Sequence, residues 1–138
     1  MPRARPRAAS GAKATDLYAL CCRIADRQRV AAGDREIVCR AFGDPRGPWN
    51  GQRLEGAVSS FVTSAVEHAP PGTPVTLRVT GHLRHVCLEV HRIGEASPAA
   101  SSAHLVAAVD AVRALGGMVS MISSSPGAST CTVRLPRA

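Results

Sequence analysis

Five histidines are the side chains with the widest range of chemistry in this chain: His68, His82, His85, His91 and His104. A neutral imidazole can bind a transition metal or move a proton near neutral pH. His82, His85 and His91 are close in sequence, but alternation along a strand places His85 and His91 on one face and leaves His82 in a turn. Histidines that face solvent on a strand explain this pattern, so no metal site is predicted.

Hydroxyl and thiol side chains are numerous, yet they form no recognised catalytic motif. The sequence has no Ser/His/Asp triad order, no phosphate-binding P-loop and no paired acidic motif. Its five cysteines are odd in number, form no Cys-x-x-Cys pair and mostly lie within apolar runs. They are therefore expected to be buried thiols in a reducing cytosol.

Length and composition predict one soluble domain. The chain has 138 residues, of which 45% are apolar, and this is enough to form one ordinary core. With one Trp, one Tyr and two Phe, it is not expected to stack the bases of single-stranded nucleic acid. We find no apolar run long enough to span a membrane and no signal peptide, which predicts a cytoplasmic location.

Much of the formal net charge of +7 lies near the start of the chain. Arg3, Arg5, Arg7 and Lys13 fall in a Pro- and Ala-rich stretch without apolar periodicity, so residues 1–14 are predicted to be a disordered basic tail. Such a tail could bind anions, and it leaves open weak, non-specific binding of nucleic acid. No recognised nucleic-acid motif accompanies the charge.

Apolar periodicity divides residues 15–138 into alternating helices and strands. The clearest helix has apolar side chains at three- and four-residue spacing and stops at Pro70-Pro71-Gly72. The predicted order is a helix from Leu17 to about Gly33 with Asp16 as N-cap, a strand over Glu36–Phe42, a helix over Arg53–Ala69, strands over Val75–Val79 and Val86–Val90, a helix over Ala103–Leu115, and strands over Val119–Ile122 and Thr130–Leu135.

This order predicts an α+β fold with two layers. About three helices would cover one face of a mixed, mostly antiparallel sheet. Gly81-His82 is expected to join two of the strands as a hairpin, because both flanking segments alternate between apolar and polar residues.

Three stretches of the sequence resemble a known family: Trp49–Gly72, Leu88–Leu105 and Leu115–Pro136. Together with Gly43-Asp44, they resemble the ATP-binding domain of sensor histidine kinases, a GHKL domain with the Bergerat fold. The positions that carry the resemblance are Gly43-Asp44, Trp49, Arg53-Leu54, Ala65, His68–Gly72, Gly116-Gly117, Ser124–Gly127, Thr130 and Val133–Pro136. It covers roughly residues 16–136 and implies a two-layer α/β sandwich.

The resemblance places two serines at the positions that bind magnesium in that family. There, two polar residues one turn apart on the long helix, commonly Asn or Glu and then Asn, position the attacking chemistry and hold the metal. Here these positions carry Ser60 and Ser64. Magnesium takes oxygen ligands at about 2.1 Å in octahedral geometry. Because a serine hydroxyl is shorter than an asparagine carbonyl, metal affinity is expected to fall.

The family's adenine-binding motif is also changed. It reads Asp-x-Gly-x-Gly, where the aspartate accepts a hydrogen bond from the adenine amino group and the glycines let the backbone approach the nucleotide. In this sequence His91 replaces the aspartate, and Ile93 and Glu95 replace the glycines. Gly94 is one position away, which leaves open a register shifted by one residue. In either register we expect a strand end that no longer recognises adenine.

The family's phosphate-binding turn and its lid are altered as well. The turn before the second long helix is normally rich in glycine, whereas Ser101–Leu105 contains none, although Ser101 or Ser102 is a good N-cap. Only twelve residues separate His91 from His104, so the long mobile lid of the family is expected to be essentially absent.

We therefore predict a stand-alone, non-catalytic regulator of bacterial signal transduction. It would bind another signalling protein: a kinase, a response regulator or a sigma-factor regulator. No catalytic residue, metal or cofactor is expected, and ATP with magnesium would bind only to a pocket that is divergent and still active. The vestigial pocket positions are Ser60, Ser64, His68, His91, Ile93, Glu95, Ser102, His104 and Thr130.

Other functions stay open at the level of sequence. One is a divergent ATP-binding protein kinase or anti-sigma-type regulator, in which the pocket still works. Another is a DNA-associated regulator that uses the basic tail. A homodimer is left open in each case.

Overall fold

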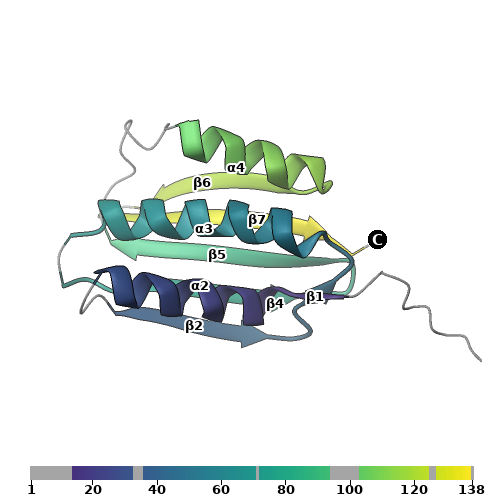
Figure 1. The fold of residues 1–138 in the computed structure, drawn as a ribbon, viewed down its shortest axis with the longest axis horizontal. Coiled ribbons are helices and arrows are strands. Elements are labelled where there is room, and N and C mark those ends of the chain that lie inside the picture. The colour runs from purple at the N-terminus through teal and green to yellow at the C-terminus, as the bar shows by residue number, and fades with distance from the viewer. Residues whose placement is uncertain (1–13, 33–35, 71, 94–102, 125–126, 138) are drawn as a thin grey trace, which may run out of the picture.

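The computed structural model describes residues 14–32, 36–70, 72–93, 103–124 and 127–137 (Figure 1). The elements, in chain order, are β1 (Thr15–Asp16), α2 (Leu17–Ala32), β2 (Ile37–Phe42), β3 (Arg46–Gly47), α3 (Gly51–His68), β4 (Val75–Gly81), β5 (His85–Ile93), α4 (Ala103–Ala114), β6 (Met118–Ser124) and β7 (Ala128–Pro136).

A five-stranded sheet forms one layer and the helices form the other. The strands lie in the order β2-β4-β5-β7-β6, with β2 parallel to β4 and every other pair antiparallel. Helices α2, α3 and α4 lie side by side over one face of this sheet (Figure 1). The predicted α+β fold is therefore confirmed. We call the face beneath the helices the inner face and the opposite one the open face.

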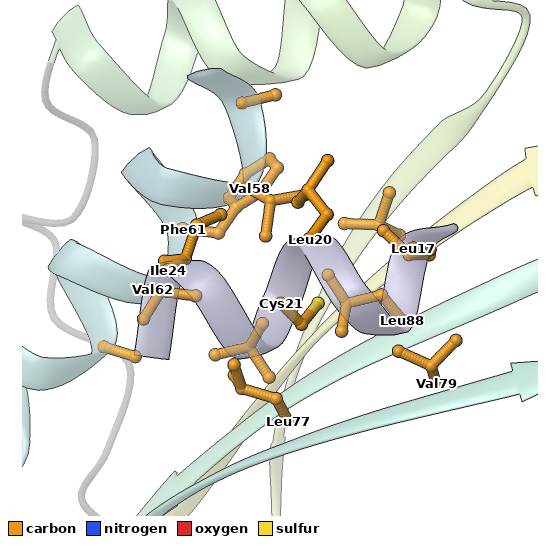
Figure 2. Close-up of a cluster of buried hydrophobic side chains, with 14 of the residues drawn as sticks. Leu17, Leu20, Cys21, Ile24, Val58, Phe61, Val62, Leu77, Val79 and Leu88 are labelled. Atoms are coloured by element: carbon orange, nitrogen blue, oxygen red, sulfur yellow. The ribbon is translucent and has the colours of Figure 1, made fainter. Parts of the chain in front are cut away.

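The core fills the space between the helices and the inner face. Inward side chains of β4 and β5, including Leu77, Val79 and Leu88, are fully buried. They lie close to apolar side chains of α2 and α3, such as Ile24 and Phe61 (Figure 2). The strands alternate between buried and more exposed residues because successive side chains point to opposite faces.

Helix α3 is held at both ends. The Asn50 side chain accepts a hydrogen bond from the Arg53 N–H at 3.0 Å, which satisfies a donor that has no partner within the helix. Ala69 adopts an extended conformation at the other end, immediately before Pro70. Asp16 caps α2 in the same way, as predicted, by accepting from the Ala19 N–H at 3.0 Å.

Two very short strands were not predicted. β1 and β3 pair with each other, away from the main sheet. A strand of two residues is too short to show apolar alternation, so the sequence pattern could not predict β1 or β3. The segment is anchored by Trp49, whose Nε1–H donates to the Pro136 carbonyl at 2.7 Å. A Cβ on Gly47 would lie 2.2 Å from the Trp49 ring, so only glycine fits there.

Among the residues that the structure describes, no helix combines the length and the apolar character needed to cross a membrane.

Candidate functional site

A small cleft lies on the inner face between α3 and α4. It is lined by residues from both helices and from three strands: Phe61, Ser64, Ala65, Val90, Arg92, Leu105, Met121, Ile122, Ser129, Thr130 and Cys131. Its volume is about 40 Å³. A single water needs roughly 10–15 Å³ by such a measure, whereas small-molecule pockets commonly measure about 300–1,000 Å³. The described residues alone therefore leave room for water but not for a nucleotide.

The end of β5 directs a charged side chain into this cleft. Val86, Leu88 and Val90 are buried at alternate positions, and the next inward residue is Arg92, with 7% of its surface exposed. Its guanidinium donates to the His68 carbonyl at 3.4 Å, which is a long contact. Burial lowers the pKa of Arg92. Since arginine keeps its proton in proteins, the cleft contains a buried cation.

Helix α3 contributes only one of its two predicted serines. Ser64 lines the cleft, and its backbone carbonyl accepts a hydrogen bond from Nδ1 of His68 at 2.8 Å. Ser60 is not among the residues that line the cleft, and its hydroxyl donates to the Gly56 carbonyl within the helix at 3.2 Å. His68 therefore stabilises the end of α3 and supplies a carbonyl to Arg92.

The described lining of the cleft includes no carboxylate. Its inward polar side chains are the Arg92 guanidinium, the thiol of Cys131 and the hydroxyls of Ser64 and Ser129, whereas the Thr130 hydroxyl faces His91 on the open face. Burial raises the pKa of the Cys131 thiol to about 12, so this group stays protonated at neutral pH and is a poor nucleophile. The lining thus has neither a general base nor a strong magnesium ligand.

His91 and Ile93 are not among the described residues that line the cleft, so their place in a nucleotide pocket stays a prediction. Nδ1 of His91 lies 2.8 Å from Oγ1 of Thr130 on the open face, and Ile93 is 47% exposed. The reason is the pleat of β5, because residues 91 and 93 point away from the buried residues 90 and 92. The alternation that begins at Val86 is the sequence pattern that indicates Arg92 as the inward-facing residue at the end of β5.

The remaining predicted positions are placed only in part. Thr130 borders both the cleft and the hollow on the open face that contains His91. His104 lies in the first turn of α4, although its side chain is not described. Glu95 and Ser102 lie outside the described residues, as do the predicted lid remnant and the tail residues Arg3, Arg5, Arg7 and Lys13.

The chain is similar in structure to several solved histidine kinases. The nucleotide-free catalytic domain of histidine kinase ThkA superposes with a TM-score of 0.77 at 10% identity, covering 91% of this chain and 96% of that one. The mycobacterial sensor histidine kinase MprB gives 0.75 at 20% identity, with 90% and 96% covered. For the Acinetobacter baumannii histidine kinase AdeS the TM-score is 0.76 at 11% identity, with 91% and 66% covered.

The chain has the fold of a histidine kinase catalytic domain. No family model matches the sequence, and no curated protein matches it. At 10–20% identity the structural likeness establishes the fold of this histidine-kinase-like domain and leaves its activity to be argued from the site.

The cleft of this histidine-kinase-like domain favours the shifted register of the adenine motif. On β5 the residue that faces the space between the two long helices is Arg92, so a motif aspartate facing that space would correspond to Arg92. In this register Gly94 takes the place of the first glycine. The expected acceptor is then replaced by a cationic donor, which is a larger chemical change than the replacement by histidine predicted from the sequence.

Proposed function

We propose that this histidine-kinase-like domain is non-catalytic and regulates bacterial signalling by binding another protein. The observation that carries the proposal is the buried guanidinium of Arg92 in the cleft between α3 and α4. An adenine amino group is a hydrogen-bond donor and needs an acceptor. A guanidinium offers five N–H donors and no acceptor, so two donors would meet.

The metal position supports the same proposal. Of the two polar positions on α3, Ser64 reaches the cleft while Ser60 bonds to its own helix. One short hydroxyl is a weak substitute for the amide and carboxylate oxygens that magnesium prefers. Without the metal, the negative charge that develops on transferring phosphoryl groups would lack its main stabiliser.

Apolar side chains around the edge strand support protein binding. β6 ends the sheet beside α4 (Figure 1), so no other described strand pairs with its outer backbone groups. Met118 and Ile122 point to the open face of β6 and are 69% and 56% exposed, while Met121 on its inner face and Val106 on α4 are 50% and 56% exposed. Met118 and Ile122 thus expose two large apolar side chains on one face of the edge strand, and exposed apolar surface of this kind is found at protein interaction sites.

The catalytic half of the proposal is tested by phosphate release. Purified protein with ATP and magnesium should release no more phosphate than a sample without protein, at any protein concentration. Release proportional to the amount of protein, and lost with the Ser64→Ala variant, would show instead a divergent enzyme that uses this cleft.

The binding half is tested by charge substitutions at the β6 edge. Partners of the native chain would be captured by chemical crosslinking in cells and each interaction then measured with purified proteins. Met118→Glu with Ile122→Glu should weaken the interaction at least about tenfold, because each buries a charge in an apolar interface. Val30→Glu is the matched control, since Val30 is 87% exposed on α2, away from β6. Equal binding by all variants would exclude this edge.

Light scattering on the same variants distinguishes a homodimer from a complex with another protein. If the native chain is a dimer and the β6 double variant is a monomer, the apolar edge joins two copies of this chain. If both are monomers, the edge is free for a different protein, as proposed here.

A further inference from the structure

Three potential metal ligands converge at the end of the β4–β5 hairpin, away from the cleft. One ligand atom from each of His82, His85 and Cys87 lies within 4.8 Å of the other two. His85 and Cys87 are alternate residues of β5 and share its open face, while His82 comes from the hairpin turn. Our sequence prediction of no metal site considered His91 as the third histidine and left Cys87 among the buried thiols.

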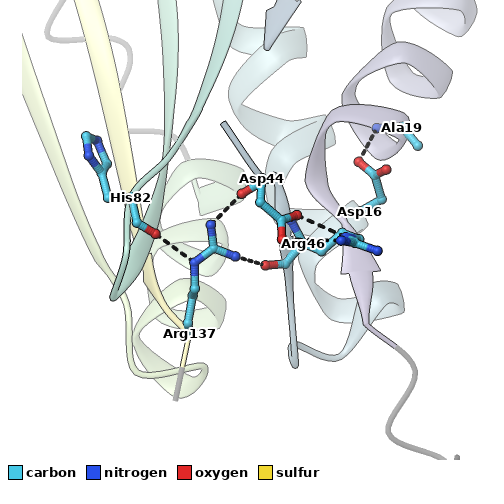
Figure 3. Close-up of polar contacts among 6 residues, drawn as sticks. All are labelled: Asp16, Ala19, Asp44, Arg46, His82 and Arg137. Atoms are coloured by element: carbon cyan, nitrogen blue, oxygen red, sulfur yellow. Dashed lines mark hydrogen bonds and ion pairs between the residues drawn. The ribbon is translucent and has the colours of Figure 1, made fainter. Parts of the chain in front are cut away.

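The turn that contributes His82 is fixed in place from several sides. Its N–H donates to the His85 carbonyl at 2.8 Å. Its carbonyl accepts from Nε of Arg137 at 2.7 Å, and the Arg137 N–H donates to the Arg84 carbonyl at 2.9 Å. The same guanidinium donates to the carbonyls of Asp44 and Arg46, so Arg137 joins the hairpin to β3 and the loop before it (Figure 3). The backbone of the cluster is therefore held before any ligand arrives.

We propose that His82, His85 and Cys87 bind a thiophilic d10 metal ion, Zn²⁺ or Cu(I), on the open face of the sheet. A thiolate and two imidazoles suit both ions, whereas magnesium and calcium prefer oxygen ligands. The bond to sulfur forms as the Cys87 thiol releases its proton to solvent, and no oxidation state changes. A zinc ion would keep a fourth position for water or an outside ligand, while Cu(I) is satisfied by three ligands.

Side-chain rotation is enough to complete the site. Zinc–nitrogen and zinc–sulfur bonds of about 2.0–2.1 and 2.3 Å place tetrahedral ligand atoms roughly 3.4–3.8 Å apart. The ligand atoms must therefore close by about 1 Å from their separation of up to 4.8 Å. The rings of His82 and His85 are stacked with centroids 4.5 Å apart, and one must turn so that both nitrogens point at the ion. His82 is exposed and can turn without disturbing the core.

A neighbouring arginine, Arg134, should affect how tightly the metal binds. The Arg134 guanidinium lies 3.4 Å from Nδ1 of His85, where it opposes a cation and covers one of the ring nitrogens. A site with Cu(I) and one thiolate is neutral, whereas a site with Zn²⁺ and one thiolate carries one positive charge. Repulsion by Arg134 therefore costs less for Cu(I), and removing this arginine should strengthen zinc binding.

Metal titration of the full chain without a histidine tag tests the proposal. Cobalt, used as a probe for zinc, should bind at one equivalent and give a thiolate-to-metal charge-transfer band. Zinc should displace it, and Cu(I) is titrated separately without oxygen against a chromogenic chelator. His82→Ala, His85→Ala and Cys87→Ser should each lower affinity at least about tenfold, because each removes a ligand. Arg134→Gln should raise zinc affinity several-fold by removing a nearby positive charge.

Two variants control for general loss of histidine or thiol. His91→Ala removes an imidazole from the same strand and face, and Cys22→Ser removes a thiol from α2, so both should bind as the native chain does. Far-ultraviolet circular dichroism checks that each variant is folded, and His82→Ala is the least disruptive because the residue is exposed in a turn. Absence of both cobalt and Cu(I) binding would overturn the proposal, as would binding that survives Cys87→Ser.

Discussion

At the scale of single residues, the direction in which Arg92 points changes the interpretation of the adenine position. Aligned by sequence alone, the family's adenine motif places His91 at the position of its aspartate. Alternation along β5 places Arg92 in the cleft and His91 on the open face. The change of type at Ser60 and Ser64 was visible in the sequence, but the internal hydrogen bond of Ser60 was not. The face that residue 92 occupies was also visible, in the alternation from Val86 to Val90, but the family motif does not use that pattern.

A matched pair of substitutions tests the register at β5. Arg92→Asp puts a carboxylate into the cleft, whereas His91→Asp puts one on the open face, so only the former can accept a hydrogen bond from adenine. Combined with Ser60→Asn and Ser64→Asn, Arg92→Asp should increase affinity for ADP, and His91→Asp should not. Neither triple variant should hydrolyse ATP, because the changes do not supply a glycine-rich turn or a lid.

Fluorescent ADP binding and phosphate release measure the two properties separately. A gain in affinity with His91→Asp but not with Arg92→Asp would contradict the register. Hydrolysis by either triple variant would show that the turn and the lid do not limit catalysis.

At the scale of elements, the long helix was the most predictable part of the fold. Its apolar spacing predicted Arg53–Ala69, and α3 spans Gly51–His68 with Leu54, Val58 and Phe61 buried. The strands around the hairpin were also predicted, because alternation and turn residues act locally. The pairing of β2 with β4, like the short strands β1 and β3, depends on contacts across the chain and leaves little trace in local sequence.

Phe61 should be a large contributor to stability, because it is 2% exposed in the core between α3 and the sheet. We expect Phe61→Ala to lower the free energy of unfolding by about 3–5 kcal/mol through lost burial and the cavity left behind. Urea unfolding followed by circular dichroism measures this loss. Gln52→Ala, at an exposed position of the same helix, should change it by less than about 0.5 kcal/mol. Equal effects of the two substitutions would contradict the buried face of α3.

An ion pair between helices gives a pH dependence. Hydrogen bonds from Arg27 and Arg23 lower the pKa of Glu55 below its ordinary value of 4.5. A lowered pKa in the folded state stabilises the fold above the unfolded pKa, and this contribution is lost as pH falls through the folded pKa. Since the pair is exposed, Glu55→Gln should cost less than about 1 kcal/mol at pH 7.

The difference in unfolding free energy between native and Glu55→Gln chains should therefore shrink as pH falls below about 4.5. Urea unfolding at several pH values measures it. A difference that is constant down to pH 2 would show that Glu55 contributes by packing and not by charge.

At the scale of the whole molecule, the basic tail is a separate question from the folded domain. Four cationic side chains precede Ala14. If they bind duplex DNA by releasing counterions, the logarithm of affinity should fall with the logarithm of salt, and removing them should reduce that slope by about 3–4. Fluorescence anisotropy at several salt concentrations compares the full chain with a chain that begins at Ala14. Equal slopes would assign any DNA binding to the folded domain.

The two faces of the sheet give the molecule two sites of different kinds. The inner face contains the cleft, in which a buried cation replaces an acceptor, and the open face contains His82, His85 and Cys87. The proposed loss of nucleotide binding at the cleft would not alter the proposed metal ligands on the open face. The apolar core between the helices and the sheet includes neither Ser60 and Ser64 nor Arg92, so we expect the fold to tolerate changes at these positions.

Calorimetric titration of the native chain with ATP and magnesium tests the central claim most directly. Because Arg92 offers no acceptor and Ser64 is a weak metal ligand, we predict no saturable heat above that of dilution at millimolar nucleotide. Saturable binding with a dissociation constant in the micromolar range, weakened by Arg92→Ala or Ser64→Ala, would contradict this claim and identify the cleft as a working nucleotide site.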